Sequence, residues 1–133
     1  MKGRCLCGDV TWAYDAAPTW NALCHCESCR RATSAPVVAC LGARRDAFRW
    51  TGAAPAAYAS SPGAERLFCG RCGSSMAWRG EAFPEEIFLY AACLDDPADY
   101  VPDRHTHYGE RLSWLSLADD LPKIEGSNRE AET

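Results

Sequence analysis

The sequence Cys24-His25-Cys26-Glu27-Ser28-Cys29 places three thiols within six residues of a 133-residue chain. Packing alone does not explain this crowding, because safer small hydrophobic residues can replace a buried cysteine. Zinc does explain it, because thiolates bind Zn²⁺ at about 2.3 Å and the ion takes four donors. Cys24, Cys26 and Cys29, here called the cysteine triplet, supply three. The fourth position is either open to a small molecule or closed by a protein ligand, for which the candidates are Cys40, His105 and His107.

Two further cysteine pairs lie on either side of the triplet. Cys69-Gly70-Arg71-Cys72-Gly73 has the spacing of a zinc knuckle, in which glycines let the backbone curl so that both sulfurs face one ion. A knuckle supplies two ligands, so a second pair must come from Cys5-Leu6-Cys7-Gly8 or from the triplet. We favour the first pairing, because it gives one closed and one open site and leaves no odd thiol. The competing interpretations are free thiols or, for the knuckle, a redox dithiol.

Composition and charge exclude several classes of protein. The chain has 14 Lys and Arg against 18 Asp and Glu, a net charge of −4, which gives no reason to expect nucleic acid or an anionic membrane as a partner. No apolar run approaches the roughly 18 residues of a membrane span, and the first residues lack the apolar core of a signal peptide. We therefore expect a cytoplasmic protein, in which nine cysteines are better explained as metal ligands than as disulfides.

Short apolar runs and alternating stretches separated by Gly and Pro predict an all-β fold with little helix. Apolar and polar residues alternate over residues 10–14, and another short strand delivers the first cysteine of the triplet. The unbroken apolar run at residues 36–41 predicts a buried strand. The most apolar strand is expected over residues 87–93.

The helix content and the domain bounds also follow from the sequence. Residues 27–33 predict a short helical turn, since an acidic residue lies near its start and two arginines lie near its end. The length predicts one domain, which we place at residues 1–125. Residues 126–133 carry no apolar side chain except Ala131, so we expect a disordered C-terminal tail.

In order and spacing, the seven clustered cysteines resemble those of a known family. The segments that carry the likeness are Arg4-Cys5-Leu6-Cys7-Gly8, Cys24-His25-Cys26-Glu27-Ser28-Cys29-Arg30-Arg31 and Phe68-Cys69-Gly70-Arg71-Cys72-Gly73. They resemble the glutathione-dependent formaldehyde-activating enzyme family, which includes centromere protein V. The resemblance implies a tent-like, zinc-stapled β fold shared with the Rab exchange-factor accessory proteins. It also implies two zinc ions per chain: a structural zinc on Cys5, Cys7, Cys69 and Cys72, and a catalytic zinc on Cys24, Cys26 and Cys29.

The family reaction implied by this resemblance is the condensation of glutathione with formaldehyde to S-hydroxymethylglutathione, which is carbon–sulfur lyase chemistry. The donor set agrees, because three thiolates make zinc a weak Lewis acid, poor at generating hydroxide, whereas coordination deprotonates an incoming thiol outright. We therefore expect a zinc-dependent carbon–sulfur lyase acting on a thiol–aldehyde adduct, with glutathione as the co-substrate. The alternative is a non-enzymatic zinc-stabilised interaction module, which needs no exchangeable coordination position.

Other polar residues near the cysteines have two interpretations each. Arg30 and Arg31 either bind the carboxylates of glutathione or balance the negative charge of the zinc–thiolate cluster. His25 lies between two ligands on an extended segment and should point away from the metal, which favours a structural histidine. His105 and His107 are the acid–base candidates. For these two, the favoured interpretation is a polar surface pair near a turn.

Overall fold

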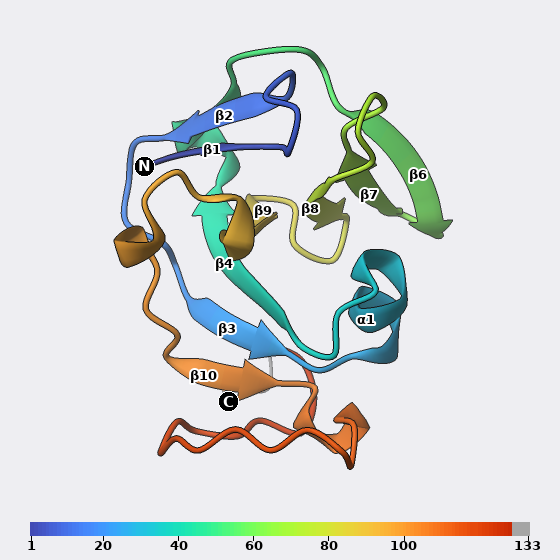
Figure 1. The fold of residues 1–133 in the computed structure, drawn as a ribbon, viewed down its shortest axis with the longest axis vertical. Coiled ribbons are helices and arrows are strands. Elements are labelled where there is room, and N and C mark those ends of the chain that lie inside the picture. The colour runs from blue at the N-terminus through green and yellow to red at the C-terminus, as the bar shows by residue number, and fades with distance from the viewer. Residues whose placement is uncertain (129–133) are drawn as a thin grey trace.

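The computed structural model describes residues 1–128, which form two β-sheets and one α-helix (Figure 1). The small sheet has the order β1-β2-β5, with bounds Lys2–Arg4, Thr11–Tyr14 and Phe48–Trp50. The large sheet has the order β10-β3-β4-β9-β8-β7-β6, with bounds Arg104–Thr106, Asn21–Cys24, Val38–Arg44, Glu86–Tyr90, Ser75–Gly80, Ala64–Phe68 and Ala56–Ser61. The helix α1 spans Glu27–Thr33, and short 3-10 helices span Arg45–Ala47, Ala91–Cys93, Pro97–Asp99 and Tyr108–Glu110.

The predicted β-rich fold with little helix is confirmed, and α1 has the predicted bounds. The apolar run expected as one strand over residues 87–93 is divided. β9 ends at Tyr90, and Ala91–Cys93 turn as a 3-10 helix. Apolarity marked this stretch as buried, but it did not mark where the strand gives way to the turn.

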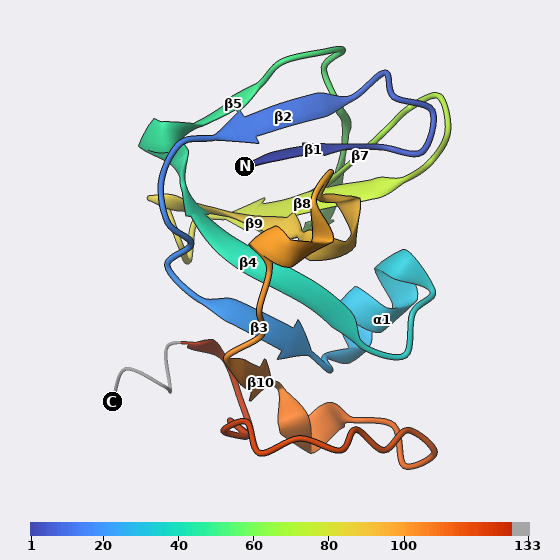
Figure 2. The ribbon, with the colours of Figure 1, turned by 60° about the vertical axis from the view of Figure 1, so that its left-hand side comes forward.

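The strand β4 lies inside the large sheet, between β3 and β9. Its sequence is almost wholly apolar, and Leu41 and Ala43 are completely buried. One part of the core packs between the two sheets, which lie one above the other in Figure 2. A second, smaller part surrounds Trp20, Cys24, Cys40 and Tyr90. The cysteine triplet lies at the edge of this second part, so the core supports it directly.

The helix α1 starts within the triplet itself. Cys26 is its N-cap, and the Cys26 sulfur accepts a hydrogen bond from the backbone N–H of Cys29 at 3.2 Å. The helix ends at Ser34, whose left-handed backbone (φ 57°) turns the chain back toward β4. One thiol thus caps the helix and holds two sulfurs on the same side of the turn.

The strand β10 pairs with β3 in parallel, whereas the other paired strands are antiparallel. The register sets His105 opposite Leu23 and Thr106 opposite Cys24. The segment after β10 returns along it, as a bridge between His105 and Lys123 shows. This topology brings residues near position 105 to the edge of the triplet.

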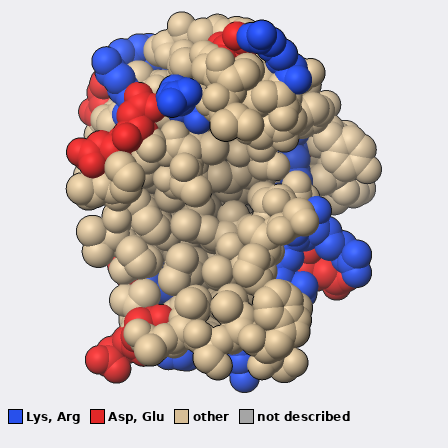
Figure 3. Space-filling view, viewed as in Figure 1, with Lys and Arg blue, Asp and Glu red and all other residues tan. Residues whose placement is uncertain are grey.

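Among the described residues, no helix has the length and apolarity that a membrane crossing requires. On the face seen in Figure 3, acidic and basic side chains gather in small mixed groups near the margin. Of the predicted C-terminal tail, residues 126–128 are described, and the carbonyl of Gly126 accepts a hydrogen bond from the His107 N–H at 2.8 Å. Residues 129–133 lie outside the described part of the chain.

Candidate metal centres

Two loops far apart in sequence bring Cys5, Cys7, Cys69 and Cys72 together, here called the four-cysteine cluster. In each loop, a glycine directly after the second cysteine has a positive φ, 85° at Gly8 and 79° at Gly73, a conformation that glycine adopts without strain. Backbone N–H groups point at the first sulfur of each loop, from Val10 at 3.3 Å and from Cys72 at 3.4 Å. The pairing of the first and last cysteine pairs is therefore observed.

The sulfur positions fit a tetrahedral zinc ion. Four sulfurs at about 2.3 Å from a common centre lie ~3.8 Å from one another. The Cys7 sulfur lies 3.6 Å from that of Cys5 and 3.7 Å from that of Cys69. All four ligand atoms lie within 4.8 Å of one another. The Ser74 hydroxyl, at 3.1 Å, lowers the pKa of the Cys72 thiol to about 5, which favours the thiolate that a metal binds.

The cysteine triplet forms a separate group with the same spacing. The Cys24 and Cys29 sulfurs lie 3.8 Å apart, and the three sulfurs lie within 4.8 Å of one another. Within residues 1–128, no fourth His, Cys, Asp or Glu ligand atom lies within that distance of all three. The sulfurs therefore match three corners of a zinc tetrahedron, and the fourth ligands considered from the sequence do not complete it.

The negative charge of the metal-free triplet is concentrated on Cys29. Hydrogen bonds from Cys24 and Cys26 lower the pKa of the Cys29 thiol to about 3, and Arg66 acts in the same direction. The pKa of Cys24 is raised, chiefly because its thiol donates to the other two sulfurs. The triplet thus carries at least one thiolate at neutral pH, which is the form that binds a metal.

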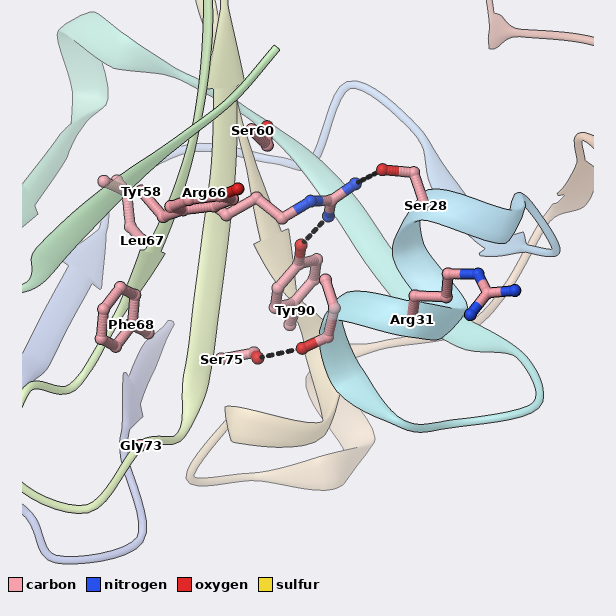
Figure 4. A pocket seen from close by; sticks show the side chains of 11 residues that line it. Ser28, Arg31, Tyr58, Ser60, Arg66, Leu67, Phe68, Gly73, Ser75 and Tyr90 are labelled. Carbon is pink, nitrogen blue, oxygen red and sulfur yellow. Dashed lines mark hydrogen bonds between the residues drawn. The ribbon is translucent and has the colours of Figure 1, made fainter.

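Arg66 is a cation beside the triplet that no sequence motif predicts. Its two terminal nitrogens lie 3.7 and 3.8 Å from the Cys29 sulfur. The same guanidinium donates hydrogen bonds to the hydroxyls of Tyr90 and Ser28, each at 2.7 Å. Figure 4 shows it reaching from β7 toward α1 between these two side chains. Two fixed acceptors therefore hold this half-buried charge against the triplet.

Arg30 and Arg31 occupy different positions from Arg66. The Arg30 side chain donates to the backbone carbonyls of His25 (3.1 Å) and Glu110 (3.2 Å), so it holds α1 to the segment after β10. Arg31 pairs with Glu27 at 2.9 Å on the exposed side of the helix. Figure 4 shows Arg31 pointing away from Arg66.

His25 is part of a buried hydrogen-bonded chain that ends at Asp119. Its Nε2 lies 2.8 Å from Nδ1 of His105, and Nε2 of His105 lies 3.0 Å from both carboxylate oxygens of Asp119. Because a carboxylate only accepts, Nε2 of His105 donates the hydrogen bond to Asp119. Burial lowers the pKa of His25 to about 4, so this ring is neutral. The chain fixes the peptide between two triplet ligands.

The expected surface position is therefore wrong for His105, which is 1% exposed. The parallel pairing of β10 with β3 and the returning segment bury this ring, and neither feature has a local sequence signal. His107 is partly exposed, has a left-handed backbone (φ 50°) and lies 3.2 Å from a carboxylate oxygen of Glu110. It lines a cavity that the triplet also lines.

Two cavities meet beside Arg66. The inner cavity has a volume of about 320 Å³ and is lined by all three triplet cysteines. The outer cavity has a volume of about 540 Å³ and lies between α1 and β7, with Arg31 and several serines in its lining (Figure 4). Both are lined by Ser28, Arg66 and Tyr90. These three residues therefore form the boundary between a cavity at the sulfurs and a cavity closer to the charged helix.

The fold and the two cysteine groups define a small β protein with one closed and one open candidate metal centre. The chain matches the family model described as glutathione-dependent formaldehyde-activating enzyme over residues 1–110. It therefore belongs to that family, and the predicted resemblance is confirmed.

Two individual proteins are also similar to this chain. An uncharacterized lyase of Schizosaccharomyces pombe is 28% identical over 112 residues, which span 74% of this chain and 81% of that protein. A crystal structure of a Rhodobacter sphaeroides protein superposes with a TM-score of 0.64 at 27% identity, covering 80% of this chain and 100% of the other. The S. pombe protein is named as a lyase, and the family is described as that of an enzyme.

Proposed function

We propose that this protein is a zinc-dependent carbon–sulfur lyase that joins a thiol to an aldehyde or cleaves the adduct, with glutathione as the co-substrate. The observation that carries the proposal is the triplet. Its three sulfurs are close enough to share one ion, the described residues offer no fourth ligand, and the sulfurs line a cavity. The family is also named for glutathione and formaldehyde. We further propose a cytoplasmic location, where thiols stay reduced.

The residues that would hold two zinc ions have separate roles. Cys24, Cys26 and Cys29 would hold zinc with one coordination position left for a substrate thiol, which the ion would bind as the thiolate. The four-cysteine cluster would hold zinc with no such position, and the ion would tie the loop after β1 to the turn between β7 and β8. We therefore assign the reaction to the triplet and folding stability to the cluster.

Arg66 has an electrostatic role in this proposal. Three thiolates outweigh the charge of Zn²⁺, and a bound substrate thiolate increases the excess. Arg66 lies 3.7 Å from the Cys29 sulfur and is held by Ser28 and Tyr90, so it offsets this charge without rearranging.

The outer cavity suits the polar part of glutathione. Arg31 and Arg66 contribute to its lining, and each can pair with a carboxylate. Of the two arginines predicted to bind glutathione, Arg31 is therefore the one we propose for this contact. Arg30 is bonded to two backbone carbonyls, and we propose that it positions α1.

Metal analysis and a thiol titration test the proposal together. The zinc-loaded protein should contain two zinc ions per chain, as the two cysteine groups require. With cobalt in the triplet, added glutathione should change the sulfur-to-cobalt charge-transfer absorption, because a fourth sulfur joins the ion. Cys29→Ser should abolish this change. Cys93→Ser is the matched control, because Cys93 belongs to neither group.

An unchanged cobalt spectrum in the presence of saturating glutathione would overturn the lyase proposal and favour the zinc-stabilised interaction module. A zinc content below two per chain under zinc-replete conditions would overturn the two-site assignment.

A further inference from the structure

The inner cavity is larger and more apolar than formaldehyde requires. Its volume is about 320 Å³, whereas a water molecule, which is close to formaldehyde in size, takes ~30 Å³ of liquid volume. Part of its wall is an aromatic cluster made of Trp20, Trp78, Phe83 and Phe88. The Phe88 ring centroid lies 4.6 Å from that of Trp20 and 4.9 Å from those of Trp78 and Phe83. Cavities of this size and composition bind organic groups larger than formaldehyde.

Each tryptophan ring packs against a glycine, Trp20 against Gly42 of β4 and Trp78 against Gly80 of β8. A Cβ atom at Gly42 would lie 2.4 Å from Nε1 of Trp20, and one at Gly80 would lie 2.6 Å from Cη2 of Trp78. Either atom would displace the ring. Neither glycine has a positive φ, so clearance for the ring, and not backbone freedom, is what these positions require.

Trp20 is also fixed at its polar edge. Its indole N–H donates to a carboxylate oxygen of Glu86 at 3.1 Å, and Thr19 donates to the other oxygen at 2.9 Å. The ring therefore has a defined orientation before any ligand binds. A wall fixed in this way is preorganised for an apolar group of matching size.

We infer that the aldehyde substrate carries a ring-sized apolar group, as an aromatic aldehyde does, and that the aromatic cluster binds this group while the carbonyl faces the triplet. The inference rests on the proposed lyase function and goes beyond formaldehyde. The outer cavity offers Arg31 and three serines to a polar thiol, whereas Trp20, Trp78, Phe83 and Phe88 line the inner cavity alone, so we assign the carbonyl component to the inner cavity. A formaldehyde-derived adduct is too small to contact most of the aromatic wall.

The reaction balances without any other reactant. A bond forms between the thiol sulfur and the carbonyl carbon, the carbon–oxygen double bond becomes single, and the thiol proton ends on that oxygen. The product is a hemithioacetal, and the reverse step returns thiol and aldehyde. One methylene in an apolar pocket changes the specificity of an enzyme by roughly 10- to 200-fold, so a whole ring should give a preference of at least about 100-fold.

The test compares substrates on the zinc-loaded full chain. Exchange NMR would measure catalysed formation and breakdown of the hemithioacetal from glutathione with benzaldehyde or with formaldehyde, and from formaldehyde with phenylmethanethiol. We expect benzaldehyde to have the highest kcat/KM, by about 100-fold over formaldehyde. A preference for formaldehyde would overturn the inference. A preference for phenylmethanethiol would also overturn it, because it would place the ring on the thiol.

Variants and a binding measurement connect the preference to the cavity. NMR titration of benzyl alcohol, an unreactive ring of the same size, should show binding that Phe88→Ala weakens at least tenfold. Gly80→Ala, which displaces Trp78, should also weaken it, so a folding defect in Phe88→Ala leaves the inference falsifiable. Trp114→Ala is the control, since Trp114 is 71% exposed and lies outside this cavity.

The outcomes separate this inference from the proposed function. If glutathione enters the cobalt site and formaldehyde reacts without any preference for benzaldehyde, the proposed lyase function is supported and the aromatic aldehyde substrate is rejected. If benzyl alcohol binds equally to wild type, Phe88→Ala and Gly80→Ala, the cavity assignment is wrong whatever the enzyme does.

Discussion

Replacing Cys69 by serine should destabilise the whole domain, because Cys69 joins segments that are distant in sequence. The residue is 1% exposed, and its sulfur lies 3.7 Å from that of Cys7 on the other loop. Structural zinc contributes roughly 10–16 kcal/mol of apparent binding free energy in small zinc modules, so one of four thiolates accounts for about 3–4 kcal/mol. The total stability of a domain is only about 5–15 kcal/mol. We therefore expect Tm to fall by about 10–15 °C, given the few degrees that each kcal/mol is worth at this chain length.

The assay pairs thermal unfolding with zinc analysis of the same samples. In excess zinc, Cys69→Ser should show the lower Tm, and its four-cysteine cluster should release zinc to a chelator more readily than the cluster of the wild type. Cys93→Ser is the matched control. The Cys93 thiol is half-buried and contacts the Ser75 carbonyl at 3.6 Å, but it belongs to neither group. The control should keep two zinc ions and lose less than about 1 kcal/mol. A Cys69→Ser protein with two zinc ions and a wild-type Tm would refute the closed-site reasoning.

Three further predictions concern the triplet. Arg66→Met should raise the KM for glutathione at least tenfold, because a hydrogen-bonded charge contributes about 1.5–3 kcal/mol. Tyr90→Phe should have a smaller effect. Equal steady-state kinetics in Arg66→Met and wild type would exclude the role of Arg66. His105→Phe leaves Nε2 of His25 unpaired, so the triplet should bind zinc about 10- to 100-fold more weakly while the four-cysteine cluster is unaffected. Competition with a chromophoric chelator would measure both affinities. Equal losses of affinity at both sites would contradict this prediction. A mild chelator should remove zinc from the triplet first and leave the circular dichroism spectrum folded, since three protein ligands hold an ion less firmly than four; loss of structure with the first ion would reverse the two assignments.

The sequence was most informative where spacing alone determines geometry. The helical turn over residues 27–33 and the pairing of the two outer cysteine pairs follow from local spacing and ligand arithmetic, and the structure has both. The strand β4 was recognisable because its residues 38–41 are apolar, mostly buried and part of the predicted run over residues 36–41. Each of these features is determined by residues that are close together in the sequence or by the number of ligands that a zinc ion requires.

The rest of the site depends on strand register, which has no local signal. Arg66 reaches the triplet across the space between β7 and α1 (Figure 4), and a register shift between Leu67 and Phe68 interrupts the pairing of β7 with β8. His105 meets His25 through the parallel pairing of β10 with β3, across 80 positions of sequence. In the sequence, an arginine or histidine that lies on the surface cannot be distinguished by its neighbours from one that strand pairing brings to a buried site.

The most direct test of the account is a crystal structure of the zinc-loaded protein with glutathione, measured at the zinc absorption edge. We predict two anomalous peaks per chain. One should be enclosed by the four-cysteine cluster, and the other should be bound by the triplet with the glutathione sulfur as its fourth ligand. A triplet ion whose fourth ligand is a protein side chain, such as Cys40 or His107, would contradict the account, as would the absence of a second peak under excess zinc.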